Sequence, residues 1–287
     1  MDLQLRDMIK NASVRIKSMA GQELLVLHEE NAREIANQAG SSLREVFKTA
    51  LMQDIVPYRY LRNGGIISCK DQLVLAESTV AVIGAGGLGG QVILLLARTG
   101  IGKLVVIDSD RFDETNLNRQ ALCTMDCLGK SKALEAGEKV REINPAVEVE
   151  PHEVRLTPAN SGTFLKGVHV IVDALDNVVD RFVLERVAKA LRVPMVHAGI
   201  AGFEGQVMTI YPEDPGLALV YGDPAKWGKA RKTPEALLGV PAVTASLVAT
   251  LEAMEVLKIL LGKGEPMRNR LLRPDLETGE FHQIMFA

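Results

Sequence analysis

A glycine-rich loop between two apolar runs, in residues 81–110 (AVIGAGGLGGQVILLLARTGIGKLVVIDSD), constrains the fold of this chain more than any other feature. Gly84, Gly86 and Gly89 form G-x-G-x-x-G directly after a β-branched run and at the start of a helix-compatible stretch. Such a loop lets the backbone turn tightly and lets phosphate oxygens approach the amides at the positive end of the helix. Asp108 ends the next apolar run, where a carboxylate can accept hydrogen bonds from ribose hydroxyls. The pattern therefore predicts an adenosine-nucleotide site on a strand–turn–helix unit.

The rest of the chain after Ser78 repeats this alternation of short β-branched runs with longer helix-compatible stretches. Parallel strands joined by crossover helices have this pattern. We expect strands at residues 80–83, 104–107, 168–172, 195–197 and 204–212, and a helix at 243–261. The fold class is therefore α/β, with a doubly wound, mainly parallel sheet and a Rossmann-like ATP-binding half.

Two segments differ from this pattern. Residues 1–56 have helical spacing with no alternating strand pattern, which predicts a helical N-terminal appendage ahead of a main domain at 57–287. Residues 213–238 are rich in Pro, Gly and charged residues and lack periodicity, which predicts a long surface crossover loop.

The appendage admits a second interpretation. Ala36, Gly40 and Val46 have a spacing similar to that of a helix-turn-helix. However, residues 1–56 hold 7 Lys and Arg against 8 Asp and Glu, so the positive excess that binds DNA phosphates is missing. We favour a docking or dimer-supporting helical hairpin, and nucleic acid is an unexpected partner.

Composition limits the class of protein. The 287 residues are 47% hydrophobic and 24% charged, which suits a globular chain with a large core. No stretch reaches the roughly 18 uninterrupted apolar residues of a membrane span, so we expect a cytoplasmic protein with no membrane contact. Three cysteines, Cys69, Cys123 and Cys127, give neither a disulfide framework nor the paired C-x-x-C of a zinc site.

Cations follow the expected ribose carboxylate. Residues 108–120 (DSDRFDETNLNRQ) contain Asn116, Arg119 and Gln120, and Lys132 comes soon after. A hydride-transfer site has little use for these groups, whereas a nucleoside triphosphate needs fixed positive partners for charge that develops on its phosphate oxygens. Further on, Asp176 follows a predicted strand, at the sheet edge where α/β folds bind ligands. Asp176 could hold Mg²⁺ or could equally cap the following helix.

Together these motifs resemble the ThiF/MoeB/HesA family, the bacterial relatives of ubiquitin-activating enzymes. The resemblance runs from about Tyr58 to the C-terminus and depends on Gly-x-Gly-Gly-x-Gly, Asn-Leu-x-Arg-Gln, Gly-x-x-Lys, Asp-x-x-Asp-Asn and EGQV, in that order. It implies an adenylyltransferase that binds ATP and Mg²⁺. The positions that it assigns to nucleotide binding are Gly84, Gly86, Gly87, Gly89, Asp108, Asp110, Asn116, Arg119, Gln120 and Lys132.

The resemblance also implies the chemistry and the partners. The family attaches AMP to the C-terminal carboxylate of a ubiquitin-like sulfur-carrier protein ending in Gly-Gly, and releases pyrophosphate. The catalytic positions would be Arg62, Arg119, Lys132 and Asp176, with Asp176 serving Mg²⁺. The family's arginine matching Arg62 reaches the ATP of the other subunit, which implies a homodimer.

This sequence departs from the family in its cysteines. Many relatives hold zinc through two C-x-x-C pairs, which this chain lacks, so no zinc site is expected. Some relatives carry a cysteine in the crossover loop, and residues 213–238 have none, so sulfur is expected from an external donor. Cys123 and Cys127, which follow Arg119, are the alternative participants in sulfur transfer. The carrier and pathway stay open between thiamine, molybdenum or tungsten cofactor, and cysteine-linked sulfur. The alternative functions are a non-catalytic nucleotide-binding scaffold or sensor and an NAD-dependent oxidoreductase.

Overall fold

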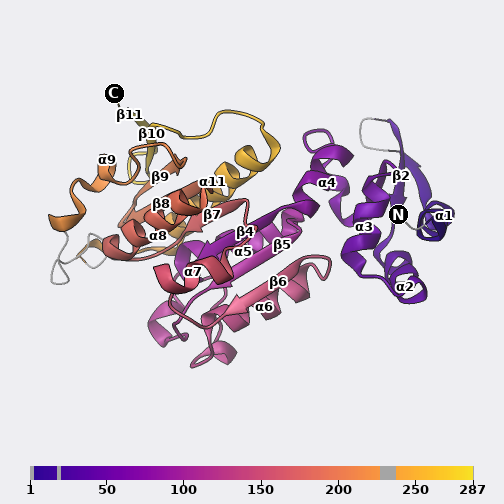
Figure 1. Ribbon diagram of the computed structural model, residues 1–287, viewed down its shortest axis with the longest axis horizontal. Helices are drawn as coiled ribbons and strands as arrows, with labels where there is room; N and C mark the ends of the chain where they lie inside the picture. Colours follow the sequence, from indigo (N-terminus) through magenta and orange to yellow (C-terminus); the bar gives the residue numbers. More distant parts are fainter. Residues whose placement is uncertain (1–2, 18–20, 227–236, 287) are drawn as a thin grey trace.

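A twisted eight-stranded sheet flanked by helices on both faces forms the body of the molecule, and the N-terminal residues form a separate lobe at one end (Figure 1). The computed structural model describes residues 3–17, 21–226 and 237–286. The central strands are β4 (Thr79–Ile83), β5 (Lys103–Ile107), β6 (Glu148–His152), β7 (Val170–Asp173), β8 (Met195–Ala201), β9 (Glu204–Ile210), β10 (Arg270–Asp275) and β11 (Glu280–Met285). The helices around them are α4 (Cys69–Glu77), α5 (Gly87–Thr99), α6 (Lys132–Ile143), α7 (Pro158–Phe164), α8 (Val178–Leu191), α9 (Ala218–Tyr221) and α11 (Ala242–Leu261).

The strand order is β11-β10-β9-β8-β7-β4-β5-β6. The pairs from β8 to β6 are parallel, and β9, β10 and β11 extend the sheet with antiparallel pairs. The expected doubly wound, mainly parallel fold is therefore confirmed. β6 and the β10–β11 hairpin were not predicted from the sequence, and β9 ends two residues before the predicted boundary.

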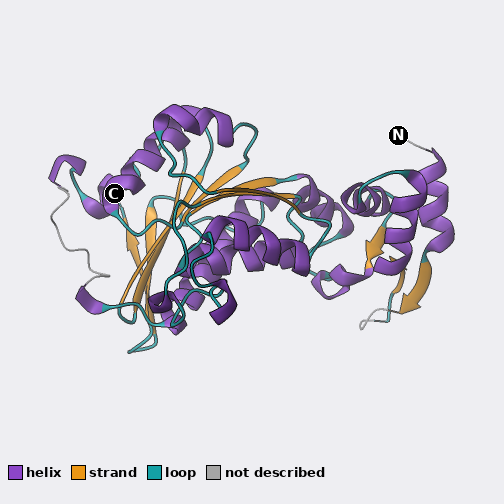
Figure 2. Ribbon diagram, turned by 90° about the horizontal axis from the view of Figure 1, so that it is seen from below, coloured by secondary structure: helices purple, strands orange, loops and turns teal. Residues whose placement is uncertain are grey.

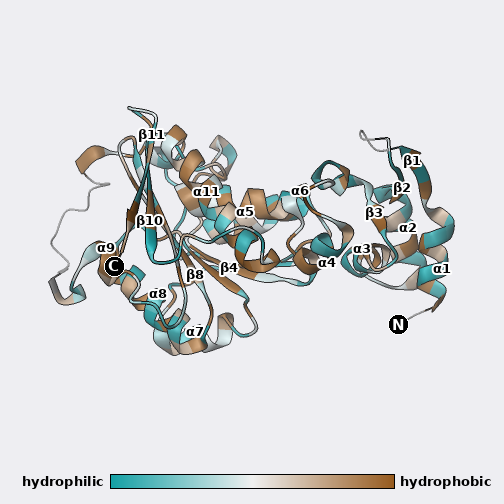
Figure 3. Cartoon of the chain, turned by 90° about the horizontal axis from the view of Figure 1, so that it is seen from above, coloured by the Kyte–Doolittle hydropathy of each residue, from teal (hydrophilic) through white to brown (hydrophobic). Residues whose placement is uncertain are grey.

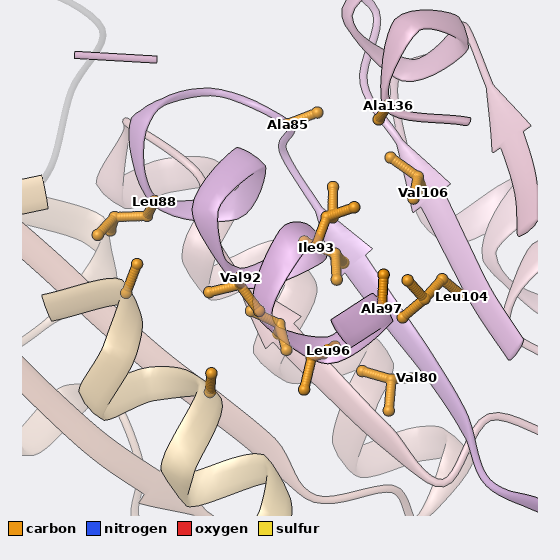
Figure 4. Close-up of a cluster of buried hydrophobic side chains, with 14 of the residues drawn as sticks. Val80, Ala85, Leu88, Val92, Ile93, Leu96, Ala97, Leu104, Val106 and Ala136 are labelled. Carbon is orange, nitrogen blue, oxygen red and sulfur yellow. The ribbon is translucent and has the colours of Figure 1, made fainter. Parts of the chain in front are cut away.

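Side chains alternate between two apolar layers along the strands. Val80 and Val82 of β4 pack with α5, α6 and α11 on one face, whereas Ala81 and Ile83 pack with α7 and α8 on the other. Figure 4 shows the first layer, where Val92, Ile93 and Leu96 of α5 lie against the strands. The helices cover both faces of the sheet in Figure 2, and the strands are largely hydrophobic in Figure 3. A strand buried on both faces has no polar side to alternate with, which explains the continuous apolar runs in the sequence.

The N-terminal lobe differs from the expected all-helical appendage. It contains three helices, α1 (Leu3–Ala12), α2 (Glu29–Ala39) and α3 (Leu43–Leu51), in agreement with the helical part of the prediction. It also contains a three-stranded sheet of β1 (Val14–Lys17), β2 (Glu23–Leu27) and β3 (Ile55–Pro57), which the sequence analysis missed. β2 pairs in parallel with β3, about thirty residues later, and so local periodicity held little information about this contact.

The lobe is fixed to the end of the sheet where the parallel strands begin. Arg44 donates to the Ala76 carbonyl and to Glu148 Oε2, at 3.2 and 3.0 Å. Tyr60, in the 3₁₀ helix η1 (Tyr58–Asn63), accepts a hydrogen bond of 2.8 Å from the buried Asn144 side chain. The carboxyl ends of the strands, at the opposite edge, stay free of the lobe.

The predicted crossover loop also differs from expectation in its first part. Leu217 is fully buried in the second apolar layer, and Asp214 is buried and bound to Arg268 at 2.7 Å. Residues 214–221 thus pack partly into the fold instead of lying entirely on its surface. Residues 227–236 of the predicted loop lie outside the described residues.

Candidate active site

A cavity of about 980 Å³ opens at the carboxyl ends of β4, β5 and β7. Its walls come from the glycine loop, the start of α5, the segment after β5 and the start of α8. Of the residues predicted from the sequence, it brings together Gly84, Gly86, Gly87, Asp108, Asp110, Arg119, Gln120, Lys132 and Asp176. These come from segments nearly a hundred residues apart in the chain.

Glycine occupies the positions of this loop for two different structural reasons. Gly84 has a φ of +98°, and a Cβ there would lie 2.5 Å from the Ala174 carbonyl oxygen. A Cβ on Gly89 would lie 1.8 Å from the Gly84 carbonyl oxygen. Packing of strand against helix therefore requires glycine at both positions. Gly86 and Gly87 line the cavity, and a Cβ there would meet neighbouring atoms only at ordinary distances of 3.5 Å or more. Their small size leaves the backbone amides at the start of α5 accessible from the cavity.

Asp108 lies between the glycine loop and the strand end, as predicted. Its two carboxylate oxygens accept hydrogen bonds of 2.7 Å, one from the Ala85 amide and one from the Asp110 amide. Burial raises the pKa of the Asp108 carboxyl, while these two amides oppose the increase. Each oxygen keeps a further lone pair, so Asp108 can still accept hydrogen bonds from a ribose.

Two cations face the cavity. Lys132 is the first residue of α6, is only 7% exposed, and forms an ion pair of 3.1 Å with Asp110. The Arg119 guanidinium is held at 3.1 Å by the Thr115 carbonyl and at 2.8 Å by Asn118. Neighbouring side chains and the Thr115 carbonyl thus orient both cations before any ligand binds. Gln120 lies beside them, buried, with its Oε1 lacking a hydrogen-bond partner among the described residues.

Three predicted site residues do not line this cavity. Gly89 is one of them, and it packs against the Gly84 carbonyl instead. Asn116 is buried, and its Oδ1 accepts a hydrogen bond of 3.1 Å from the Asp113 amide, which caps the 3₁₀ helix η2 (Glu114–Asn116). It shapes the loop that carries Arg119. Arg62 is exposed on η1, near the edge where the strands begin, and is absent from the residues that line the cavity of its own chain.

Asp176 is exposed at the rim of the cavity. The alternative interpretation, that it caps α8, is wrong. The cap is Asn177, whose side chain accepts a hydrogen bond of 2.8 Å from the Asp180 amide. Asp176 is therefore available to a ligand.

The cavity also contains residues that the sequence analysis missed. Val154 and Leu156 follow β6, and Val183 comes from α8, so together they give one end of the cavity an apolar wall. Arg155 and Asp180 form an ion pair of 2.7 Å beside this wall. The available signal was the apolar alternation after residue 148, which would have identified β6 and the residues beyond its carboxyl end.

The residues fit a magnesium ion that is bound mainly through phosphates. Among the described residues, no group of three or more His, Cys, Asp or Glu side chains could enclose a metal ion. Mg²⁺ usually needs only one or two carboxylates where substrate phosphates and water supply the other ligands. The exposed Asp176 carboxylate meets that requirement.

Behind the cavity, α11 contributes a buried carboxyl group. Glu252 is fully buried, and both of its carboxyl oxygens lack a partner among the described residues. Burial raises its pKa well above the ordinary value of 4.5, and the nearby Asp173 raises it further. Glu252 therefore stays protonated in the folded protein at pH values where it ionises in the unfolded chain.

This difference predicts a pH-dependent effect of Glu252→Gln on stability. The folded protein keeps the Glu252 proton above pH 4.5, whereas the unfolded chain releases it, so wild-type stability falls as pH rises through this window. The fall is up to about 1.4 kcal/mol per pH unit. Glutamine carries no such proton. The free energy of unfolding of the variant should therefore equal that of wild type near pH 4 and exceed it increasingly toward the folded-state pKa.

Denaturant unfolding at several pH values checks this expectation, with Glu255→Gln as the control. Glu255 is also buried on α11, but its carboxylate accepts hydrogen bonds of 2.6 Å from Thr209 and from the Met267 amide. Its substitution should lower stability throughout. A pH-independent difference between Glu252→Gln and wild type would contradict the prediction.

Comparison with known proteins agrees with the family resemblance of the sequence motifs. The family model described as ThiF family matches residues 60–286. The SAMP-activating enzyme E1 of Haloferax volcanii is 37% identical over 212 residues, which cover 74% of this chain and 78% of that protein. The sulfur carrier protein adenylyltransferase of Thermus thermophilus is 36% identical over 216 residues, covering 73% and 79%.

Solved structures share the fold. The structure of the microcin C7 biosynthetic enzyme MccB in complex with N-formylated MccA superposes with a TM-score of 0.68 at 20% identity, covering 89% of this chain and 83% of that one. PaaA superposes with a TM-score of 0.63 at 23% identity, covering 76% of each chain. None of the helices that the structure describes has the length and apolar character needed to cross a bilayer.

Proposed function

The chain belongs to the ThiF family, and from that premise we propose that it uses ATP to adenylate the C-terminal carboxylate of a ubiquitin-like sulfur-carrier protein for cofactor biosynthesis. The observation that carries the proposal is the single cavity that joins the glycine loop, Asp108, the cations Arg119 and Lys132, and Asp176. Two relatives that are 37% and 36% identical over the matched residues are named as a SAMP-activating enzyme E1 and a sulfur carrier protein adenylyltransferase.

The proposed reaction needs no nucleophile from the protein. The carrier carboxylate is ionised at neutral pH and can attack the α-phosphate directly, forming an acyl-adenylate and releasing pyrophosphate. Catalysis then consists of positioning the two reactants and neutralising charge on the phosphate oxygens. Asp108 binds the ribose, the amides at the start of α5 bind phosphate oxygens, and Lys132 and Arg119 supply positive charge. The buried Lys132 interacts strongly because little water screens it.

Magnesium bound to the phosphates would add further charge neutralisation in this site. Asp176 is the residue that would hold it. The remaining chemistry depends on groups that the chain itself provides.

Arg62 is proposed to act across a homodimer, and α11 supports this. Its outward face carries Val243, Leu247, Thr250 and Met254, with no charged side chain before Lys258 in the last turn, and both of its glutamates are buried. An uncharged stripe of this kind on a surface helix suits contact with another protein. A second copy of the chain fits because the stripe is compatible with isologous, two-fold packing.

The direction of α11 connects this interface to Arg62. The helix begins at the cavity, where Ala245 lies beside Gly87, and runs for 20 residues, about 30 Å. Just beyond its far end, Lys263 donates at 3.2 Å to the carbonyl of Ile66, four residues after Arg62. If two copies of α11 pack antiparallel, the Arg62 end of one chain meets the cavity end of the other. The arginine would then reach its partner's ATP.

Sulfur transfer is proposed to need an external donor. Burial raises the pKa of the Cys69 and Cys123 thiols, which keeps them protonated and weakly nucleophilic. Cys127 is buried and donates a hydrogen bond of 3.2 Å to Glu135. A separate persulfide-carrying protein would attack the adenylate instead.

The direct test is ATP–pyrophosphate exchange with purified protein and a panel of small Gly-Gly-ending proteins from the same organism. We expect exchange that depends on one carrier and that disappears when its terminal glycine is removed, because the attacking carboxylate is then misplaced. ATP binding without exchange by any carrier would favour a non-catalytic sensor. Binding of NADH in preference to ATP would favour an oxidoreductase.

A further inference from the structure

Beneath the cavity, five side chains from five elements form a buried hydrogen-bonded network. Asp173 ends β7, Arg181 lies on α8, His197 on β8 and Gln206 on β9, and Tyr221 ends α9 in the crossover segment. Asp173 and His197 are fully buried, and Arg181 is 3% exposed. Buried polar groups in such numbers are costly unless they are satisfied, and this network satisfies them mutually.

The Tyr221 hydroxyl is at the centre of the network. Its oxygen accepts hydrogen bonds of 2.5 Å from Arg181 Nη1 and from Gln206 Nε2. It lies 3.2 Å from His197 Nε2, and His197 Nδ1 lies 2.7 Å from Asp173 Oδ2. In the neutral tautomer that carries its proton on Nδ1, the ring donates to Asp173 and accepts the hydroxyl proton at Nε2. A hydroxyl group has one proton and two lone pairs, so all of its hydrogen-bonding capacity is used. Burial lowers the pKa of His197, which favours the neutral ring that this arrangement needs.

The network closes on the turn that carries Asp176. Arg181 donates from Nε and Nη2 to the Leu175 carbonyl, at 3.1 and 2.6 Å. The Leu175 amide donates to Asp173 Oδ1 at 3.3 Å. Both polar groups of the Leu175 backbone are therefore bound by buried ionic side chains, and Asp176 is the next residue. The position of Asp176 at the cavity depends on these contacts.

We propose that Tyr221 is a positioning residue, which acts through Arg181 to hold the turn that presents Asp176 to the cavity. The role of Asp176 in this inference rests on the proposed function. The contacts that hold the turn in place do not depend on that function. Through Tyr221, the crossover segment becomes part of the active-site support. Displacement of α9 would release Arg181 and with it the Leu175 carbonyl.

A nearby glycine supports a specific arrangement over incidental packing. A Cβ on Gly199 would lie 2.9 Å from Gln206 Nε2 and 3.3 Å from Arg181 Nη1, the two donors to Tyr221. Any larger residue at this position of β8 would displace one of the two donors. The backbone beside the network thus leaves the space that the two donors occupy.

Tyr221→Phe tests the proposal with little disturbance of packing. The phenylalanine ring can keep the edge contact with Phe182, at a centroid distance of 6.4 Å, and loses only the hydroxyl group. Tyr211→Phe is the matched control, because the Tyr211 ring lies over Arg268 and outside the network. Amide hydrogen exchange of full-length protein, without ligand, should be faster at residues 174–180 in Tyr221→Phe and unchanged there in Tyr211→Phe.

The kinetic expectation is a fall in kcat of about 10- to 100-fold in carrier-dependent exchange, the effect typical of a misplaced catalytic group. The KM for ATP should change much less, because Asp176 acts mainly in the transition state. A uniform rise in hydrogen exchange over the whole sheet would indicate a merely structural role and overturn the proposal. Unchanged amide hydrogen exchange at residues 174–180 would also overturn the proposal. Faster hydrogen exchange at these residues together with a normal kcat would do the same. Absence of activity in wild type would contradict the proposed function alone, since the hydrogen-exchange measurement needs no carrier.

Discussion

Replacing Lys132 with alanine is expected to lower carrier-dependent ATP–pyrophosphate exchange by about 100- to 1000-fold, the effect of losing one preorganised charge partner of the transition state. The physical reason is its location. Lys132 is nearly buried at the start of α6, so the charge that it directs at the cavity is weakly screened by water. Its present partner, Asp110, is largely exposed and can be solvated once the lysine is lost, so the fold should persist.

Arg119→Ala and Asp176→Ala should reduce the exchange rate similarly. The matched control is Lys130→Ala, which removes the same charge two residues away, from an exposed ammonium group that pairs with Glu135 at 3.4 Å. Its exchange rate should stay close to that of wild type. Thermal melting of each variant separates loss of chemistry from loss of fold. Near-normal exchange in all three cavity variants would exclude this cavity as the site of adenylation.

Arg62→Ala alone is expected to abolish most activity, and a mixture of Arg62→Ala and Asp176→Ala chains to restore part of it. In a mixed dimer, one cavity combines the intact Asp176 of one chain with the intact Arg62 of its partner. Random pairing would make half of the dimers mixed, so about a quarter of all cavities should be functional. The recovered exchange rate, measured after subunit exchange at equal concentrations, tests the prediction.

A mixture of Lys132→Ala and Asp176→Ala chains provides the control. Both of these residues line the same cavity of one chain, so every cavity in a mixed dimer carries one defect and no activity should return. Recovery in this control, or its absence in the Arg62 mixture after demonstrated subunit exchange, would contradict the action of Arg62 across the interface.

The sequence predicted the parts of the site that depend on short segments. The glycine loop, Asp108 at a strand end and the cations after it are linked by spacing within a single strand–turn–helix unit and the loop that follows. Their placement in one cavity agrees with the sequence because the carboxyl ends of neighbouring parallel strands meet at one edge of the sheet. Apolar runs predicted the parallel strands for the same local reason.

Contacts between distant segments decided the rest. β2 and β3 of the N-terminal lobe pair across about thirty residues, and neither has a period-2 polar face that would identify it alone. Asn177 proved to be a helix cap, and Asn116 completes the capping box of Asp113. In both, the side chain accepts a hydrogen bond from a backbone amide of its own turn, which depends on where the chain enters that turn. Tyr221 gave no signal in a segment read as surface loop. Its role depends on hydrogen bonds to Arg181, His197 and Gln206, and only the folded chain brings those donors and acceptors within reach of one hydroxyl group.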